Sequence, residues 1–189
     1  MLCSEFVRSN YYKLKIGSIT TGFLRDFLDT GYPVDQIHLV GHSLGGQLMG
    51  LIGRSLKELS GNKYVVNRIV ALDPAGPDFY PPMDGSFQHI SKYDANFVEV
   101  IHTDARKLGA SVKSGTVDFW PNAGKSQPGC GIGSILTACS HGRSWEFYSE
   151  SVVNPKAFIG VKCESWIDFK NDLNTNPDVA LMGFGSRSE

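Results

Sequence analysis

One short segment carries the pattern of a nucleophilic serine. Residues 41–45 read Gly-His-Ser-Leu-Gly and match G-x-S-x-G. In a sharp turn from a strand to a helix, this pattern lifts the Ser43 hydroxyl above the sheet, and glycines at 41 and 45 avoid collisions with neighbouring elements. The first amides of the following helix can stabilise an oxyanion. The pattern favours covalent acyl transfer; the alternative is a structural turn with an exposed serine.

A nucleophilic serine needs a base to take its proton and an acid to orient that base. After such a turn the acid precedes the histidine along the chain. Asp73 ends the apolar segment 68–74 and is the leading candidate acid, although an ordinary Asp-Pro turn would read the same way. Three other aspartates are weaker rivals because they lie in loops or just past a strand: Asp78, Asp84 and Asp104.

Five histidines compete for the role of base. His38 and His42 precede Ser43 and come too early in this order, and His89 precedes no clear element. His102 follows an apolar segment, and His141 begins a helix. The residues alone therefore leave His102 and His141 open, and they favour His141.

The elements that must position these residues follow from apolar periodicity. Helices are expected at 11–30, ending at Gly31, after Ser43, and from near Ser140. Buried strands are expected at 37–40, 68–74 and 97–103, with a possible fourth at 117–122. Strands that alternate with helices predict an α/β fold with a largely parallel sheet. The Pro- and Gly-rich segment 76–94 is expected to cross the surface.

Length and charge exclude several classes of protein. The 189 residues suggest one domain, and 18 basic against 19 acidic residues leave no electrostatic footprint for nucleic acid. The sequence contains no apolar run long enough for a transmembrane segment. The first residues also lack the apolar core of a signal peptide, so we expect either that the protein is not secreted or that its true beginning lies before Met1.

The four cysteines do not suggest a metal site. No C-x-x-C pair is present, which argues against zinc. Cys130 and Cys139 enclose eight residues and favour a loop closed by a disulfide in an oxidising compartment, whereas free buried cysteines are the alternative. Cys3 and Cys163 stand far from this loop.

Six segments in chain order resemble the animal pancreatic lipase family, which includes insect and venom phospholipases A1. They are IHLVGHSLGGQLMG (37–50), VALDPAGPDF (70–79), FVEVIHTDA (97–105), VDFWPNAGKSQPGC (117–130), CSHGRSWEFYSES (139–151), and CESWIDF with LMG (163–169 and 181–183). They cover about three quarters of the chain. The resemblance implies an α/β-hydrolase fold. Residues 1–189 are expected to form a partial catalytic domain that lacks the family's first strands and has no C-terminal β-sandwich domain.

The resemblance also assigns roles to site residues. It implies Ser43 as nucleophile, Asp73 as acid and, through the C-S-H-G-R motif, His141 as base, which makes His102 structural. The Leu44 amide is expected to be one oxyanion donor. The family's second donor lies in a loop before the elbow that this sequence lacks.

In the family the cysteines matching Cys130 and Cys139 are joined, and the loop between them is the lid. Here eight residues are too few for a lid helix over a large apolar groove. A short lid resembles the phospholipase A1 members, so phospholipid is the expected substrate and neutral lipid the alternative. Ile132, Ile135 and Leu136 either touch the lipid surface or pack under the loop.

The expected function is hydrolysis of lipid carboxylic esters at a membrane or lipid-droplet surface, by a secreted protein without a cofactor. Metal is not expected, because Ser91 replaces a carboxylate before Asp94 where some relatives bind calcium. Cys163 is expected to be free or paired with Cys3. A catalytically silent lipid-binding chain is the competing reading. The oligomeric state is not indicated.

Overall fold

The computed structural model describes residues 3–77, 79–80, 89–131, 138–164, 166–170 and 178–187. At its centre lies a parallel four-stranded sheet in the order β1-β2-β3-β4. Its strands are His38–His42, Arg68–Leu72, Phe97–Ile101 and Val117–Phe119. His42 pairs with Leu72, and Leu72 pairs with Ile101. The first three strands therefore end together, and the chain segments that follow them meet at one edge.

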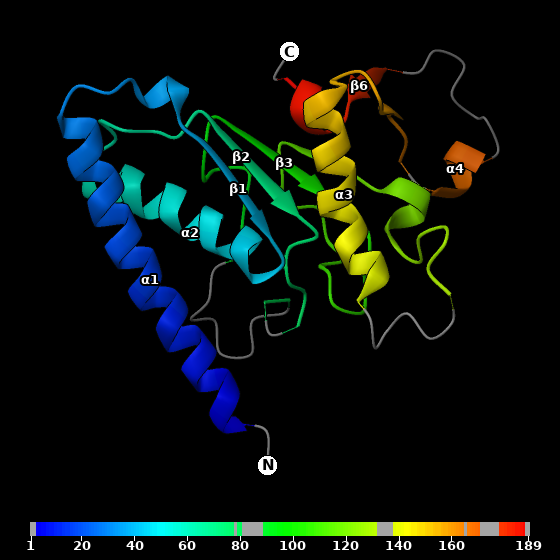
Figure 1. Ribbon diagram of the computed structural model, residues 1–189, viewed down its shortest axis with the longest axis horizontal. Coiled ribbons are helices and arrows are strands. Elements are labelled where there is room, and N and C mark those ends of the chain that lie inside the picture. The colour runs from blue at the N-terminus through cyan, green and yellow to red at the C-terminus, as the bar shows by residue number, and fades with distance from the viewer. Residues whose placement is uncertain are drawn as a thin grey trace.

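Strands β2 and β3 are buried on both faces, as their nearly continuous apolar sequences predict for a parallel sheet. Alternate residues of β2 enter two different cores. Ile69 and Ala71 pack in one core with residues of the first two helices, including Leu28, Ile52 and Leu56. Val70 and Leu72 pack in the other, with Phe119, Met182, Phe147 and Tyr148. The sheet is thus covered by helices on both faces (Figure 1).

Three long helices build these layers. Helix α1 (Cys3–Asp29) packs against α2 (Leu44–Leu59), and α3 (Cys139–Val153) covers the opposite face. The helix expected at 11–30 begins earlier, at Cys3, and ends beside Gly31, whose φ of +98° suits glycine. The helix expected near Ser140 begins at Cys139.

The last part of the chain forms a small unit that the periodicity did not predict. Strands β5 (Ile159–Val161) and β6 (Val179–Leu181) pair antiparallel, with the short helix α4 (Trp166–Lys170) between them in sequence. A 3₁₀ turn, Gly183–Gly185, follows. The amide of Gly183 donates to Oε1 of Glu99 at 2.6 Å, which ties this turn to the central sheet.

The structure corrects the expected course of segment 76–94 and shortens the strand expected at 117–122. In the segment expected to cross the surface, residue 78 and residues 81–88 lie outside the described residues, but Phe79 and Ile90 are buried in the core. Burial of these two apolar side chains is favourable, and it holds this part of the segment against the core although Pro and Gly residues surround it. The possible strand at 117–122 exists but ends at Phe119, and a 3₁₀ turn, Pro121–Gly124, follows it.

Within the described ranges, no helix combines the length and the apolar character needed to cross a membrane.

Candidate active site

Ser43 lies at the sharp turn between β1 and α2. Its φ of 55° and ψ of −122° place a residue with a side chain in a strained region of backbone space, and such strain concentrates at functional sites. The Ser43 amide donates to Leu72 O at 3.0 Å, and its carbonyl accepts from Gly46 and Ala75. A Cβ at residue 41 would lie 2.3 Å from Gly45 O, so only glycine allows this turn.

The prediction that a side chain at residue 45 would collide with a neighbouring element is wrong. A Cβ on Gly45 would meet no atom within 4 Å, apart from its own chain neighbours and helix. The close approach falls instead on Gly46, where a Cβ would lie 3.2 Å from Pro74 Cβ. The segment after β2 therefore packs against the start of α2 one residue later than the motif suggests.

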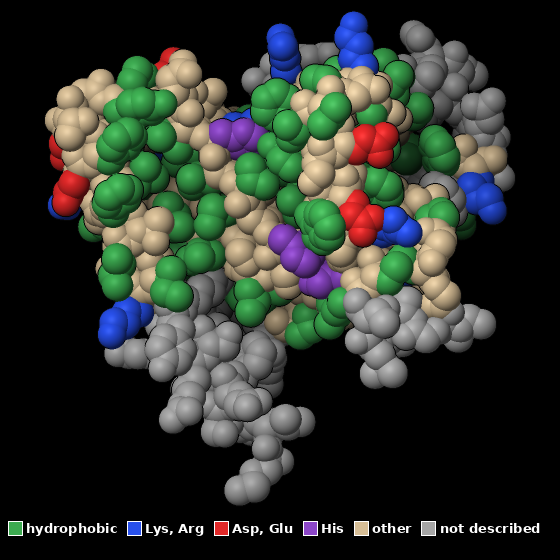
Figure 2. All heavy atoms as spheres, in the orientation of Figure 1, with side chains coloured by type: hydrophobic (Ala, Val, Ile, Leu, Met, Phe, Trp, Pro, Cys, Tyr) green, Lys and Arg blue, Asp and Glu red, His purple; other side chains and the backbone are tan. Residues whose placement is uncertain are grey.

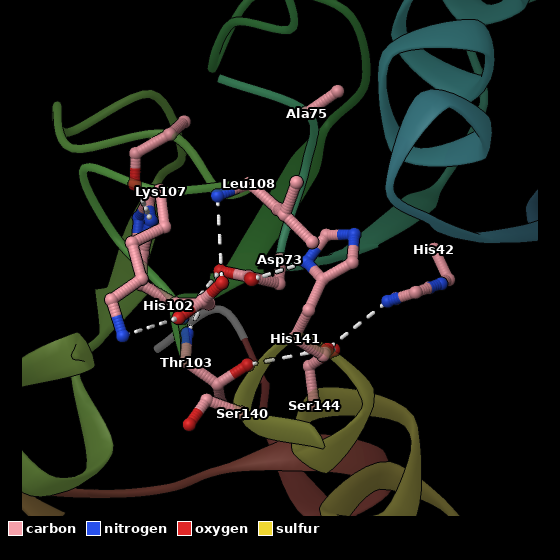
Figure 3. A network of polar contacts seen from close by, with 12 residues as sticks. His42, Asp73, Ala75, His102, Thr103, Lys107, Leu108, Ser140, His141 and Ser144 are labelled. Carbon is pink, nitrogen blue, oxygen red and sulfur yellow. Dashed lines mark hydrogen bonds and ion pairs between the residues drawn. The ribbon is translucent and has the colours of Figure 1, made fainter. Parts of the chain in front are cut away.

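Asp73 and His141 lie side by side at this edge of the sheet. His141 Nδ1 is 2.6 Å from Asp73 Oδ2, and both side chains are buried (Figure 3). Oδ1 of the same carboxylate accepts from the amides of Thr103 and Asp104 at 2.8 and 3.2 Å. These hydrogen bonds compensate the desolvation of the buried carboxylate. Its second oxygen, Oδ2, accepts the hydrogen bond that His141 Nδ1–H donates.

The close fit around Asp73 requires a glycine from another loop. A Cβ at residue 109 would lie 2.3 Å from Asp73 Oδ1. Gly109 therefore leaves room for the carboxylate, a role that nothing in the local sequence indicates. Thr103 was also missed as a donor, although it is the last residue of the strand predicted at 97–103.

The imidazole of His141 presents its other nitrogen, Nε2, away from Asp73 (Figure 3). Among the described residues, no hydrogen bond joins the Ser43 hydroxyl to this ring. The structure does bring the two segments together through His42, whose Nε2 lies 3.1 Å from the carbonyl oxygen of His141. Catalytic hydrogen bonds are often long in structures without substrate, so Ser43 and His141 stay candidates for nucleophile and base without this bond.

Two of the competing histidines, His102 and His89, contact groups other than Asp73 and Ser43. His102 is fully buried, with Nδ1 3.0 Å from Ala110 O and Nε2 2.8 Å from Asp118 Oδ1. Its ring stacks on Trp120 at a centroid distance of 3.6 Å. With both nitrogens occupied, His102 has no free lone pair for a substrate proton. His89 Nδ1 contacts its neighbour, Ile90 O, at 2.7 Å.

Asp104 is the one competing aspartate among the described residues, and no hydrogen bond joins its carboxylate to His141. Asp104 accepts from the Leu108 amide and pairs with Lys107 at 3.8 Å, and burial raises the pKa of its carboxyl. Asp78 and Asp84 lie outside the described residues.

Comparison with known proteins identifies the family. The family model described as Lipase matches residues 4–186. The chain belongs to the lipase family. It is 38% identical to human pancreatic lipase-related protein 2 over 83% of this chain and 37% of that protein. It is 43% identical to phospholipase A1 VesT1.02 of Vespa tropica over 68% of this chain and 41% of that protein. The rat pancreatic lipase-related protein 2 is 35% identical over 96% of this chain and 42% of its own length.

The chain thus spans about two fifths of the length of these lipase-family relatives. Its parallel sheet, helices on both faces and serine turn agree with the α/β-hydrolase fold expected from the sequence.

The expected disulfide between Cys130 and Cys139 is present. It links the loop after β4 to the first residue of α3, two residues before His141. Within the loop that the family resemblance implies as a lid, residues 132–137, including Ile132, Ile135 and Leu136, lie outside the described residues. Cys163 is a free thiol.

Leu44 begins α2, and the residue is 46% exposed. Amides in the first turn of a helix have no acceptor within the helix, so the Leu44 N–H is free in principle for a developing oxyanion.

Asp94 forms an ion pair with Arg54. Asp94 Oδ1 and Oδ2 accept from the Arg54 guanidinium at 3.0 and 3.2 Å. The same two oxygens also accept from the hydroxyl and amide of Ser91. No group of three or more metal-binding side chains occurs in the described part of the chain.

Proposed function

We propose that this lipase-family chain hydrolyses carboxylic esters of lipids through an acyl-enzyme, with Ser43, His141 and Asp73 as nucleophile, base and orienting acid. The observation that carries the proposal is the buried 2.6 Å contact between His141 Nδ1 and Asp73 Oδ2, beside a strained serine turn. A carboxylate that accepts from Nδ1–H fixes the imidazole tautomer in which Nε2 carries the lone pair for the serine proton.

The proposed reaction has two matched halves. Ser43 Oγ forms a bond to the acyl carbon while its proton passes to His141 Nε2. The intermediate then collapses, and Nε2 returns the proton to the departing alcohol oxygen. Water next attacks the acyl carbon and gives a proton to Nε2, and the Ser43 oxygen leaves with that proton as the free acid forms.

Asp73 stabilises the imidazolium that forms in each half. Its own orientation is set by two backbone amides from the segment after β3, so it does not need to move during the reaction. The Leu44 N–H at the start of α2 is the proposed oxyanion donor from this chain.

Phospholipid is the proposed substrate class. Its support is the short loop closed by Cys130 and Cys139 and the similarity to a protein named phospholipase A1. A disulfide persists in oxidising compartments, which supports a secreted protein. The proposed partner is therefore a lipid surface outside the cell.

The nucleophile is tested with a fluorophosphonate probe, which labels a serine only when a base has activated it. The wild-type chain is expected to be labelled at Ser43, and Ser43→Ala is expected to lose both labelling and ester cleavage. Ser18→Ala, on an exposed position of α1, is the matched control. Turnover that survives Ser43→Ala would disprove the assignment.

Substrate class is tested by fatty-acid release from phosphatidylcholine vesicles and from a triacylglycerol emulsion. Faster release from the vesicles supports the proposal, and faster release from the emulsion shows a neutral-lipid lipase. Vesicle binding without labelling or release identifies the competing, catalytically silent lipid-binding chain.

A further inference from the structure

His42 makes a contact that the proposed reaction has not yet used. Its Nε2 lies 3.1 Å from the backbone carbonyl oxygen of His141, and the two rings lie 4.4 Å apart between centroids (Figure 3). A carbonyl oxygen only accepts, so Nε2 of His42 carries the proton and donates it. The side chain just before the serine therefore bonds directly to the residue that supplies the base.

The position of His42 in the fold makes this bond informative. His42 is the last residue of β1 and pairs with Leu72 in the sheet, so its backbone is fixed. Ser43 is its immediate neighbour, and His141 lies in the first turn of α3 on the opposite face of the sheet. The bond spans 99 positions of sequence and joins the elbow to that turn.

The His141 carbonyl collects further side-chain donors. The Ser144 hydroxyl donates from within α3 at 3.0 Å, and Thr103 Oγ1 approaches from the segment after β3 at 3.5 Å. Among these contacts, only that of His42 comes from the segment that carries Ser43 (Figure 3).

From this geometry we propose that His42 is a positioning residue that fixes the His141 imidazole relative to Ser43. The proposal rests on the function proposed above, because it assigns His42 a role in that reaction. His42 reaches neither the ester nor the proton in transit. It holds the backbone from which the base projects.

The charge state of His42 suits this role. Burial lowers the pKa of His42, and its bond to the His141 carbonyl only partly opposes that effect. The titratable groups that face it are His141 from α3 and Asp73 from the segment after β2. A neutral His42 does not oppose the positive charge that His141 gains during acyl transfer, whereas a second imidazolium at 4.4 Å would.

Three variants separate the bond from the ring. His42→Phe keeps a ring but removes the donor, and His42→Gln restores an N–H donor without an imidazole. His38→Phe is the matched control, since His38 lies on the same strand and its Nε2 has no hydrogen-bond partner.

The kinetic expectation is a change in kcat rather than in KM. His42→Phe is expected to lower kcat about 5- to 10-fold, the loss that follows from one net hydrogen bond, with KM within about twofold of wild type. His42→Gln is expected to recover most of kcat, and His38→Phe to match wild type. A kcat for His42→Phe equal to that of wild type, or a fall in all three variants alike, would overturn the proposal.

Spectra of ¹⁵N-histidine-labelled protein test the same idea without turnover. The Nδ1 and Nε2 signals of His141 are expected to shift or broaden in His42→Phe and to stay in place in His42→Gln and His38→Phe. Unchanged His141 signals in His42→Phe would reject the positioning role. If the wild-type chain neither turns over nor labels at Ser43, the proposed function fails, while the spectra still decide whether His42 orients His141.

Discussion

Oδ2 of Asp73 and Nδ1 of His141 lie 2.6 Å apart across 68 positions of sequence, in a place closed to water. The carboxylate reaches this position from the loop after β2, where Asp73 has a φ of 42°. The hydrogen bond and the positive φ of Asp73 both depend on contacts with other segments of the fold. Variants that change these contacts test this dependence.

Asp73→Asn is expected to lower kcat about 10³- to 10⁴-fold. The amide preserves the shape of the side chain but can offer N–H where the carboxylate offers an oxygen, so His141 settles in the wrong tautomer. Steady-state ester hydrolysis measures the loss, and circular dichroism checks the fold. Activity within tenfold of wild type would show that Asp73 is not the orienting acid.

Gly109→Ala is expected to displace the Asp73 carboxylate, since the new Cβ would lie 2.3 Å from Oδ1. We expect a loss of about 1–3 kcal/mol in unfolding free energy together with reduced hydrolysis. Urea unfolding measures the first and ester cleavage the second. Gly22→Ala is the control: its Cβ would meet nothing within 4 Å in α1, so stability is expected to hold or rise. Equal behaviour of the two variants would contradict the prediction.

Glu99→Gln is expected to change how stability depends on pH. Burial raises the pKa of Glu99 from 4.5 to about 7, although the Gly183 amide and Arg68 favour its charged form. Between these two values the folded chain holds a proton that the unfolded chain has lost. Glu99 therefore makes stability fall as pH rises through this window, by up to about 3 kcal/mol.

His38 acts in the opposite direction over part of this range. Burial lowers its pKa from 6.5 to about 4, so its contribution to stability is lost as pH falls through that window. Urea unfolding of Glu99→Gln from pH 4 to 7.5 is expected to lack the fall that Glu99 causes and to keep the rise due to His38. A pH profile identical to that of wild type would refute the role of Glu99.

Removing the disulfide by Cys130→Ser is expected to lower the unfolding free energy by about 2–3 kcal/mol. Because Cys139 is the first residue of α3, unfolding of the variant is expected to start in the first turn of this helix, which carries His141. Thermal denaturation with and without reductant measures the effect. Cys163→Ser serves as the control, because that thiol is free and its loss is expected to change little.

The sequence was informative where a residue type has a narrow set of uses. A serine between glycines after an apolar strand predicted the strained turn at Ser43, and the structure has it. The order of acid and histidine, together with the family resemblance, predicted that Asp73 and His141 would meet, and they do. Their catalytic roles remain proposals.

The sequence was silent where a role depends on contacts between distant segments. Gly109 matters because the Asp73 carboxylate lies against it, and nothing near residue 109 in the sequence reveals this. The β5–β6 pair was missed because strands of three residues are too short to show alternation. The error at Gly45 arose because the motif fixes the turn but not which residue the next segment touches.

The bond from the Gly183 amide to Glu99 also bears on how the chain is made. Glu99 sits at the middle of β3, yet one of its two partners is synthesised 84 residues later. Before Gly183 has been synthesised, Arg68 is the one described hydrogen-bond partner that can compensate the desolvation of the Glu99 carboxyl group. The contact that completes the partners of Glu99 therefore forms only after the segment with Gly183 has been synthesised, although the strands of the sheet precede it in the chain.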